Sequence, residues 1–108
     1  MRVLFVCSRN RLRSPTAEAL FSNRPDLETL SAGTAPDAET PVSAELIEWA
    51  DIIFAMEKVH RRHLEEKFGK LLSQKKLVVL GIPDKYRHMD PALIELLLKK
   101  VPPFLPVI

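Results

Sequence analysis

The alternation of short apolar runs with helix-forming runs predicts an α/β protein, a three-layer α/β/α sandwich around a four-stranded parallel sheet. The segments between the apolar runs carry helix-start signals and are long enough for crossover connections. The 108 residues fit one domain, residues 1–108, with a single core. Right-handed crossovers place the carboxyl ends of parallel strands at one sheet edge, where we expect the ligand site.

The first half of the chain is expected to supply two strands and a helix. Residues 2–6 form an apolar run typical of a buried strand, and residues 15–21 a helix with Ser14 as N-cap. Residues 27–30 are expected to form the second strand. The following stretch, residues 31–41, is interpreted as loop because it contains glycine, proline and aspartate.

The second half continues the same alternation. We expect a short helix at residues 42–49, a strand at 51–56, an amphipathic helix at 57–68 and a strand at 76–80. The apolar residues expected on one face of the amphipathic helix are Val59, Leu64 and Phe68.

The chain closes with a loop, a helix and a tail. After a loop at residues 81–89, Asp90 is expected to cap a final helix with Pro91 at its first position, ending near Val101. The tail beyond Pro102 is expected to be extended, because proline does not continue a helix.

Composition indicates an ordinary globular protein. Hydrophobic residues make up 46% of the chain and charged residues 28%, and the net charge of +2 does not by itself indicate nucleic-acid binding. The single cysteine, Cys7, allows no intramolecular disulfide, and no apolar run is long enough for a signal-peptide core or a membrane span. We therefore expect a cytoplasmic monomer with one free thiol.

The segment after the first expected strand contains the candidate catalytic residues. Cys7 ends the strand, Arg13 follows six residues later, and Ser14 opens the next helix. A loop between a strand and a helix presents backbone N–H groups to an anion, and the helix N-terminus and Arg13 favour a thiolate. This arrangement predicts a phosphate site in which Cys7 attacks phosphorus, Arg13 holds two oxygens and Ser14 donates to the sulfur. The residues expected to form the phosphate site are Ser8, Arg9, Asn10, Arg11, Leu12, Arg13 and Ser14.

The competing interpretation is an inert packing cysteine with Arg13 on the surface, which is common for isolated cysteines. Arginine at this spacing followed by serine or threonine arises by chance on the order of once in a hundred from average composition. We therefore favour the catalytic interpretation.

The run VLFVCSRNRLRSPTAEALF resembles the phosphate-binding loop of the low-molecular-weight protein tyrosine phosphatases, whose pattern is V-C-x-G-N-x-C-R-S-P-x-A-E. SAGT at residues 31–34 is similar to that family's second-strand motif, and residues 50–64 to its third strand and helix, with Glu57 where the family usually has aspartate. The matching positions in the first motif are Cys7, Asn10, Arg13, Ser14, Pro15, Ala17 and Glu18. The resemblance implies a flavodoxin-like topology and a phosphomonoester hydrolase that works through cysteinyl phosphate without metal or cofactor.

Three features depart from the family pattern. Arg9 replaces the loop glycine, and Leu12 replaces a second cysteine that protects the nucleophile through a reversible disulfide. The segment between Ser31 and Asp51, which in the family walls the substrate cleft, is shortened. The resemblance therefore implies the reaction and leaves tyrosine specificity open.

Two aspartates are candidates for the general acid. The family's acid lies in a segment of the form I-x-D-P-Y after the fourth strand, and Ile82, Asp84 and Tyr86 match that spacing. The resemblance thus assigns the acid to Asp84 and a cleft-wall position to Tyr86. Asp90 is the alternative acid, although an N-cap role explains it fully.

Basic residues gather in sequence segments expected near the same sheet edge. They are Arg9, Arg11, Lys58, His60, Arg61, Arg62 and His63. The simpler interpretation is a solvated charged face. The alternative is a polyanion, such as a nucleotide or RNA phosphate, bound through Arg9, Arg11, Arg61 and Arg62. His60 and His63 lack further partners at metal-site spacing, so no metal is expected.

Two rival functions remain beside the phosphatase. One is a non-catalytic or weakly active phosphate-binding or phosphoryl-carrier module. A carrier keeps a cysteine at a strand end but does not need an arginine six residues later, so Arg13 argues against it. Arsenate reduction, which this fold also hosts, uses further cysteines that this chain lacks.

Overall fold

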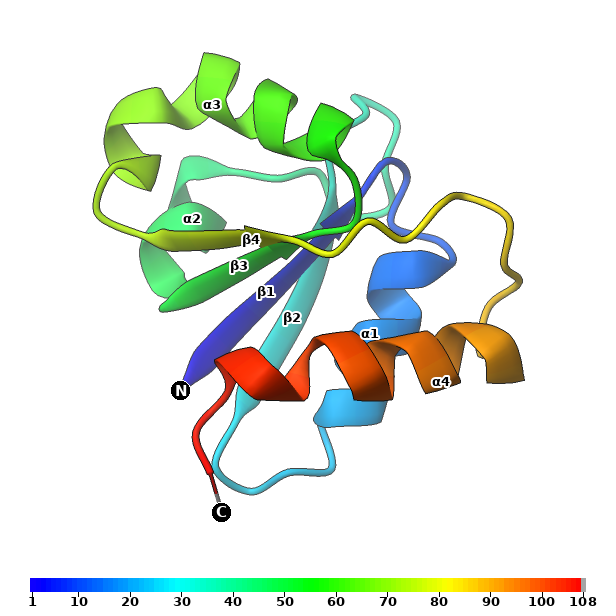
Figure 1. Ribbon diagram of the computed structural model, residues 1–108. Coiled ribbons are helices and arrows are strands. Elements are labelled where there is room, and N and C mark those ends of the chain that lie inside the picture. Colours follow the sequence, from blue (N-terminus) through cyan, green and yellow to red (C-terminus); the bar gives the residue numbers. More distant parts are fainter. Residues whose placement is uncertain (108) are drawn as a thin grey trace.

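The computed structural model describes residues 1–107 and contains a parallel sheet with strand order β2-β1-β3-β4 (Figure 1). The strands are β1 (Arg2–Cys7), β2 (Glu28–Gly33), β3 (Ile52–Ala55) and β4 (Lys76–Val79). The predicted four-stranded parallel α/β sheet is confirmed. The loops after β1, β3 and β4 lie at the same edge of the sheet (Figure 1).

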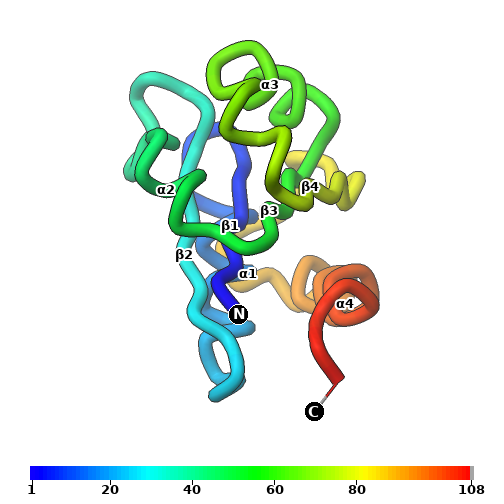
Figure 2. Tube along the Cα trace, turned by 90° about the vertical axis from the view of Figure 1, so that its left-hand side faces the viewer, coloured from blue at the N-terminus to red at the C-terminus, as the bar shows by residue number. Residues whose placement is uncertain are grey.

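Helices cover both faces of the sheet (Figures 1 and 2). They are α1 (Arg13–Phe21), α2 (Ala44–Trp49), α3 (Lys58–Leu72) and α4 (Pro91–Lys100), followed by a short 3-10 helix, η1 (Pro102–Phe104). One layer holds α1 and α4, and the other holds α2 and α3. Among residues 1–107, no helix is long and apolar enough to cross a membrane.

The central strand β1 packs against both helical layers. Val3 and Phe5 belong to the core on the α1/α4 side, whereas Leu4 and Val6 belong to the core on the α2/α3 side. Phe5 stacks on Phe54 of β3 with ring centroids 5.4 Å apart. A parallel strand buried on both faces needs apolar residues at consecutive positions, which explains the uninterrupted run in the sequence.

Several element boundaries differ from the sequence-based expectation. β2 runs to Gly33 and does not end at Leu30, because Ser31 and Ala32 pair in register with Phe5 and Val6 of β1. The tail after Val101 was expected to be extended; instead, residues 102–104 form η1.

The helix at residues 57–68 also differs. It begins at Lys58 with Glu57 as N-cap and continues to Leu72 through a kink at Phe68, where φ is −128°. Val59 was expected on its buried face but is 42% exposed. His60 and Leu64 occupy that face and are fully or almost fully buried.

Gly33, at the end of β2, is required where the chain passes behind the first loop. A Cβ at this position would collide with the carbonyl oxygen of Ser8 and lie 2.6 Å from Cβ of Ala38. This close approach lets Thr34 N–H donate to the Cys7 carbonyl and Ala35 N–H donate to the Ser8 carbonyl, each at 2.9 Å. The segment after β2 therefore braces the loop that follows β1.

Candidate active site

The loop between β1 and α1, residues 8–12, follows Cys7 at the end of the central strand. Cys7 is 3% exposed, and its Sγ lies 2.9 Å from Oγ of Ser14. Ser14 is inside the first turn of α1, so the expected N-cap role is wrong; Leu12 occupies the cap position without a side-chain bond. The Ser14 hydroxyl instead forms a hydrogen bond with the sulfur of Cys7. When Cys7 is a thiolate, Ser14 must be the donor, because the sulfur then has no proton.

Asn10 holds the loop from inside. Its φ of +58° is a left-handed conformation, which asparagine tolerates better than most residues. Its Nδ2 donates to Oγ of Ser14 at 2.9 Å and to Oγ of Ser31 at 2.8 Å. Ser31 in turn donates to the carboxylate of Glu18 on α1. One buried side chain thus ties the loop to β2 and α1.

Arg13 is 2% exposed and is held by residues from two other loops. Its Nη1 donates to Oε1 of Glu57 at 2.5 Å and to the carbonyl of Ile82 at 2.9 Å. Its Nε lies 3.7 Å from Oδ1 of Asp84. A buried guanidinium needs such partners, and their positions fix the plane of the fork. Because Arg13 also lines the hollow above Cys7, its remaining donors are available to an anion.

A hollow of about 280 Å³ opens above Cys7. It is lined by Cys7, Ser8, Arg9, Arg11, Leu12, Arg13 and Asp84. Asp84 is the single acidic residue of this lining, and its side chain is 62% exposed. Among the described residues, no aromatic side chain lines the hollow.

Two other predicted site residues lie elsewhere. Asp90 caps α4, with its Oδ1 accepting from Ala92 N–H at 3.0 Å, and it does not line the hollow. Tyr86, expected at the cleft wall, packs against the core between the sheet and α4. The geometry therefore places Asp84, and not Asp90, beside Cys7 and Arg13.

Comparison with known proteins finds relatives in sequence and in fold, although no family model matches the chain. The chain is 31% identical to a protein-arginine-phosphatase of Bacillus subtilis, in an alignment that covers 65% of each protein. A cysteine-to-serine variant of the YwlE arginine phosphatase with a phosphorylated active-site serine superposes with a TM-score of 0.70 at 26% identity, covering 97% of this chain and 100% of the other. The low-molecular-weight protein tyrosine phosphatase of Streptococcus pyogenes shares the fold, with a TM-score of 0.76 at 16% identity over 97% of this chain and 93% of the other.

In sequence and fold the chain is similar to low-molecular-weight protein tyrosine phosphatases and to arginine phosphatases. The resemblance predicted from the sequence is therefore confirmed. The alignment with the Bacillus subtilis protein spans 65% of that protein's length, which is less than two thirds.

The structure shows where the two loop residues lie that differ from the family pattern, Arg9 and Leu12. Arg9 stands at the family's glycine position, and its φ is not positive, so the backbone does not demand glycine there. Leu12, at the position of the second cysteine, is 38% exposed and lines the hollow. Both replacements thus change the side chains that line the hollow.

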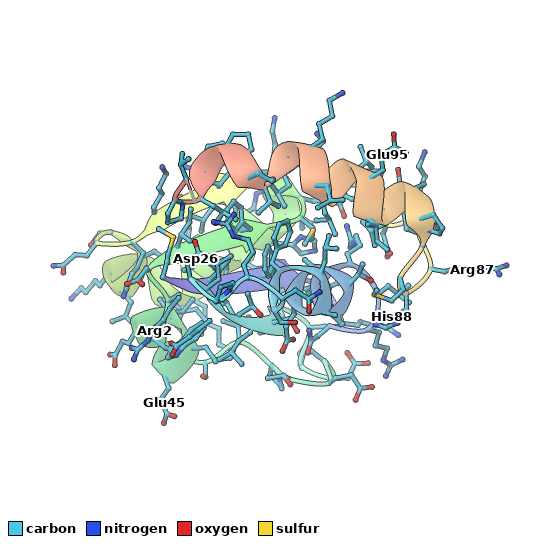
Figure 3. All side chains as sticks on the ribbon, turned by 90° about the horizontal axis from the view of Figure 1, so that it is seen from below. Arg2, Asp26, Glu45, Arg87, His88 and Glu95 are labelled. Atoms are coloured by element: carbon cyan, nitrogen blue, oxygen red, sulfur yellow. The ribbon has the colours of Figure 1, made fainter. Side chains whose placement is uncertain are left out.

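The basic residues predicted near this sheet edge line more than one depression. Arg9 and Arg11 line the hollow, and Arg11 pairs with Glu39 at 3.2 Å. Arg61 pairs instead with Glu65, one turn along α3, at 3.6 Å and lines a separate depression. On the loop between β4 and α4, Arg87 points away from the body of the molecule (Figure 3).

His60 was expected on the basic surface, and that expectation is wrong because its side chain is fully buried. Its Nε2 lies 2.9 Å from Oγ of Ser8, and its Nδ1 accepts from the backbone N–H of Glu57 at 3.0 Å. Burial and, next, the charge of Arg13 lower the pKa of His60 from 6.5 to about 4.

Sequence analysis missed two site residues, Glu57 and His60. Their spacing at the N-cap and third position of α3 forms a capping box, which was the available signal. Among residues 1–107, no group of three or more His, Cys, Asp or Glu side chains is arranged to hold a metal ion.

Proposed function

We propose that this protein is a cysteine-dependent phosphatase that hydrolyses phosphomonoesters through a cysteinyl phosphate on Cys7. The observation that carries the proposal is the placement of Cys7 Sγ, 2.9 Å from the Ser14 hydroxyl, in a hollow walled by the buried Arg13. The names of its relatives support the same reaction class, and one relative has a phosphoserine where a serine replaces its active-site cysteine.

Binding comes first. The N–H groups of the loop and the N-terminus of α1 attract a phosphate dianion, and the Arg13 fork adds a paired, charge-assisted contact. Because Glu57 and the Ile82 carbonyl already fix Arg13, little reorganisation is needed when the anion arrives.

Transfer to sulfur follows. The Cys7 thiolate attacks phosphorus in line, the S–P bond forms, and the bond from phosphorus to the leaving oxygen breaks. Asp84, in its protonated form, gives its proton to that oxygen, a contribution of about 10²–10⁴-fold. Its place in the lining of the hollow, with Oδ1 3.7 Å from Nε of Arg13, suits this role.

Hydrolysis restores the enzyme. The Asp84 carboxylate takes a proton from water, whose oxygen attacks phosphorus while the S–P bond breaks. The departing thiolate is stabilised by the Ser14 hydroxyl, which accepts from Asn10 at 2.9 Å and keeps its own proton for the sulfur. Inorganic phosphate then leaves.

The charge around the hollow bears on the substrate. Its lining contains Arg9 and Arg11 and no aromatic wall among the described residues. Relatives act on phosphoarginine or phosphotyrosine by their names, but two rim arginines disfavour a substrate guanidinium and favour acidic groups near the phosphate. Of the four arginines predicted to bind a polyanion, Arg9 and Arg11 line the hollow and would be the first contacts for such a substrate.

The test is turnover of p-nitrophenyl phosphate by wild type, Cys7→Ala, Asp84→Asn and Asp90→Asn. Asparagine is as good an N-cap as aspartate, so Asp90→Asn is a matched control that removes one carboxylate and keeps α4. We expect no turnover with Cys7→Ala, a slower turnover with Asp84→Asn and no change with Asp90→Asn. Phosphate binding without Cys7-dependent turnover would establish the non-catalytic module, and a larger loss at Asp90 would overturn the acid assignment.

A further inference from the structure

We propose that the Ser8 hydroxyl is a preset hydrogen-bond donor to the bound phosphoryl group and that buried His60 is the positioning residue that presets it. The inference rests on the proposed phosphatase function and adds a donor that the loop amides and Arg13 do not supply. It begins from a bond that crosses from α3 to the loop, between Ser8 Oγ and His60 Nε2 at 2.9 Å.

The direction of that bond is forced. A neutral imidazole carries one N–H, and Nδ1 of His60 must be the bare nitrogen because it accepts from Glu57 N–H at 3.0 Å. Nε2 therefore carries the proton and donates to Ser8 Oγ. Ser8 receives this bond and must direct its own proton elsewhere.

Ser8 has a proton free for an acceptor in the site. Ser8 lines the hollow above Cys7, and its hydroxyl has no other side-chain or backbone acceptor among the described residues. A phosphoryl oxygen bound by the loop would be an acceptor within that hollow. A hydrogen bond to a charged acceptor is stronger than one between neutral groups.

The surroundings keep His60 neutral. Its side chain is fully buried, and the groups that act on its charge come from three elements. Arg13 of α1 and His63 of α3 oppose a second proton, whereas Glu57 and Asp84 favour one. A second proton would bind to Nδ1 of His60. This nitrogen could then no longer accept from Glu57 N–H, and the hydrogen bond that orients the ring would be lost.

The same turn of α3 orients two donors. The backbone N–H of Glu57 fixes the His60 ring. The side-chain carboxylate of Glu57 accepts a hydrogen bond from Arg13 at 2.5 Å. Through Ser8 and Arg13, the start of α3 thus controls two side chains that line the hollow. The capping box at the start of α3 therefore has Arg13 of α1 and Ser8 of the first loop as partners.

The test measures affinity for inorganic phosphate by calorimetry, beside kcat and KM for p-nitrophenyl phosphate. We expect Ser8→Ala to weaken phosphate binding about 10- to 100-fold, the range for a lost bond to a charged group. Ser8→Thr, which keeps the hydroxyl, should restore binding. His60→Phe should weaken binding as Ser8→Ala does, and the double variant should be no weaker than either single variant.

His63→Gln is the control, since this exposed histidine of the same helix should leave binding unchanged. Unchanged phosphate affinity in Ser8→Ala, or additive losses in the double variant, would overturn the inference. If His60→Phe fails to fold, the Ser8→Ala and Ser8→Thr pair still decides it. Wild type that binds phosphate in a Ser8-dependent way without turnover would contradict the proposed phosphatase and leave this assignment standing.

Discussion

The two sides of the hollow differ in how firmly they are held. On the side of β1 and α1, Asn10, Arg13 and Ser14 are buried and each makes hydrogen bonds within the protein. On the side of the loop after β4, Asp84 is 62% exposed and its nearest charged partner, Nε of Arg13, is 3.7 Å away. The fold thus preorganises the anion site and leaves the proton donor adjustable, which suits a group that must give and then take a proton.

The largest loss of activity is expected from substitution on the side of β1 and α1. Arg13→Lys keeps the charge but removes the guanidinium group, which can contact Glu57, the Ile82 carbonyl and the anion at the same time. We expect kcat/KM for p-nitrophenyl phosphate to fall on the order of 10²–10³-fold. Arg87→Lys, the same change at an exposed position, should leave the rate unchanged (Figure 3). Equal rates for both variants would remove Arg13 from the anion site.

Asn10 should matter for stability as well as for binding. Asn10→Ala loses two bonds to Ser14 and Ser31 and strains a residue at φ +58°. We expect a loss of about 2–4 kcal/mol in the free energy of unfolding, measured with urea. Asn10→Gly relieves the strain without restoring the bonds, so it should recover part of the stability. Full recovery would mean that backbone conformation alone explains the position.

His60 should make stability depend on pH. Its pKa is about 4 in the folded protein against 6.5 as the ordinary value, so the unfolded state binds more protons between these values. The stability that His60 contributes is present above the ordinary pKa and is lost as pH falls toward the folded value. Urea unfolding should show a loss of roughly 2 kcal/mol from this group between pH 7 and pH 5.

The control for this pH dependence is a pair of variants. The His60 contribution should vanish in His60→Gln and persist in His63→Gln, because His63 is exposed. An identical pH slope in wild type and His60→Gln would contradict a neutral, buried His60.

The smallest effect on stability is expected on the exposed side. Asp84→Asn should change the free energy of unfolding by less than about 0.5 kcal/mol, because an exposed and distant ion pair contributes little. The same variant should lose activity in the proposed reaction. A large loss of stability would show that Asp84 is part of the scaffold, and the contrast between the two sides would fail.

Pattern and spacing predicted the layers of the fold and the loop from Cys7 to Ser14, because both depend on local sequence. Contacts between distant segments were harder to predict. The basic residues on either side of His60, Lys58 and Arg61, suggested an exposed position, and it is the phase of α3 that turns His60 inward. Two roles were predicted for Ser14. Its contact with the Cys7 sulfur is found, whereas the N-cap role is wrong because Ser14 lies inside the first turn of α1.

The shape of the hollow also escaped prediction. Tyr86 matches a family motif by spacing, but the path of the loop after β4 turns it onto the core. The pairing of Arg13 with Glu57 joins residues 44 positions apart and depends on two loops meeting at one sheet edge.

The central claim is that phosphate passes through the sulfur of Cys7. The most direct measurement is mass spectrometry of the peptide that contains Cys7, after mixing the protein with a phosphomonoester and quenching in acid during turnover. The account predicts a peptide heavier by one phosphoryl group, with the group on Cys7, in wild type and none in Cys7→Ala. Turnover without this adduct, or a phosphoryl group on another residue, would contradict it.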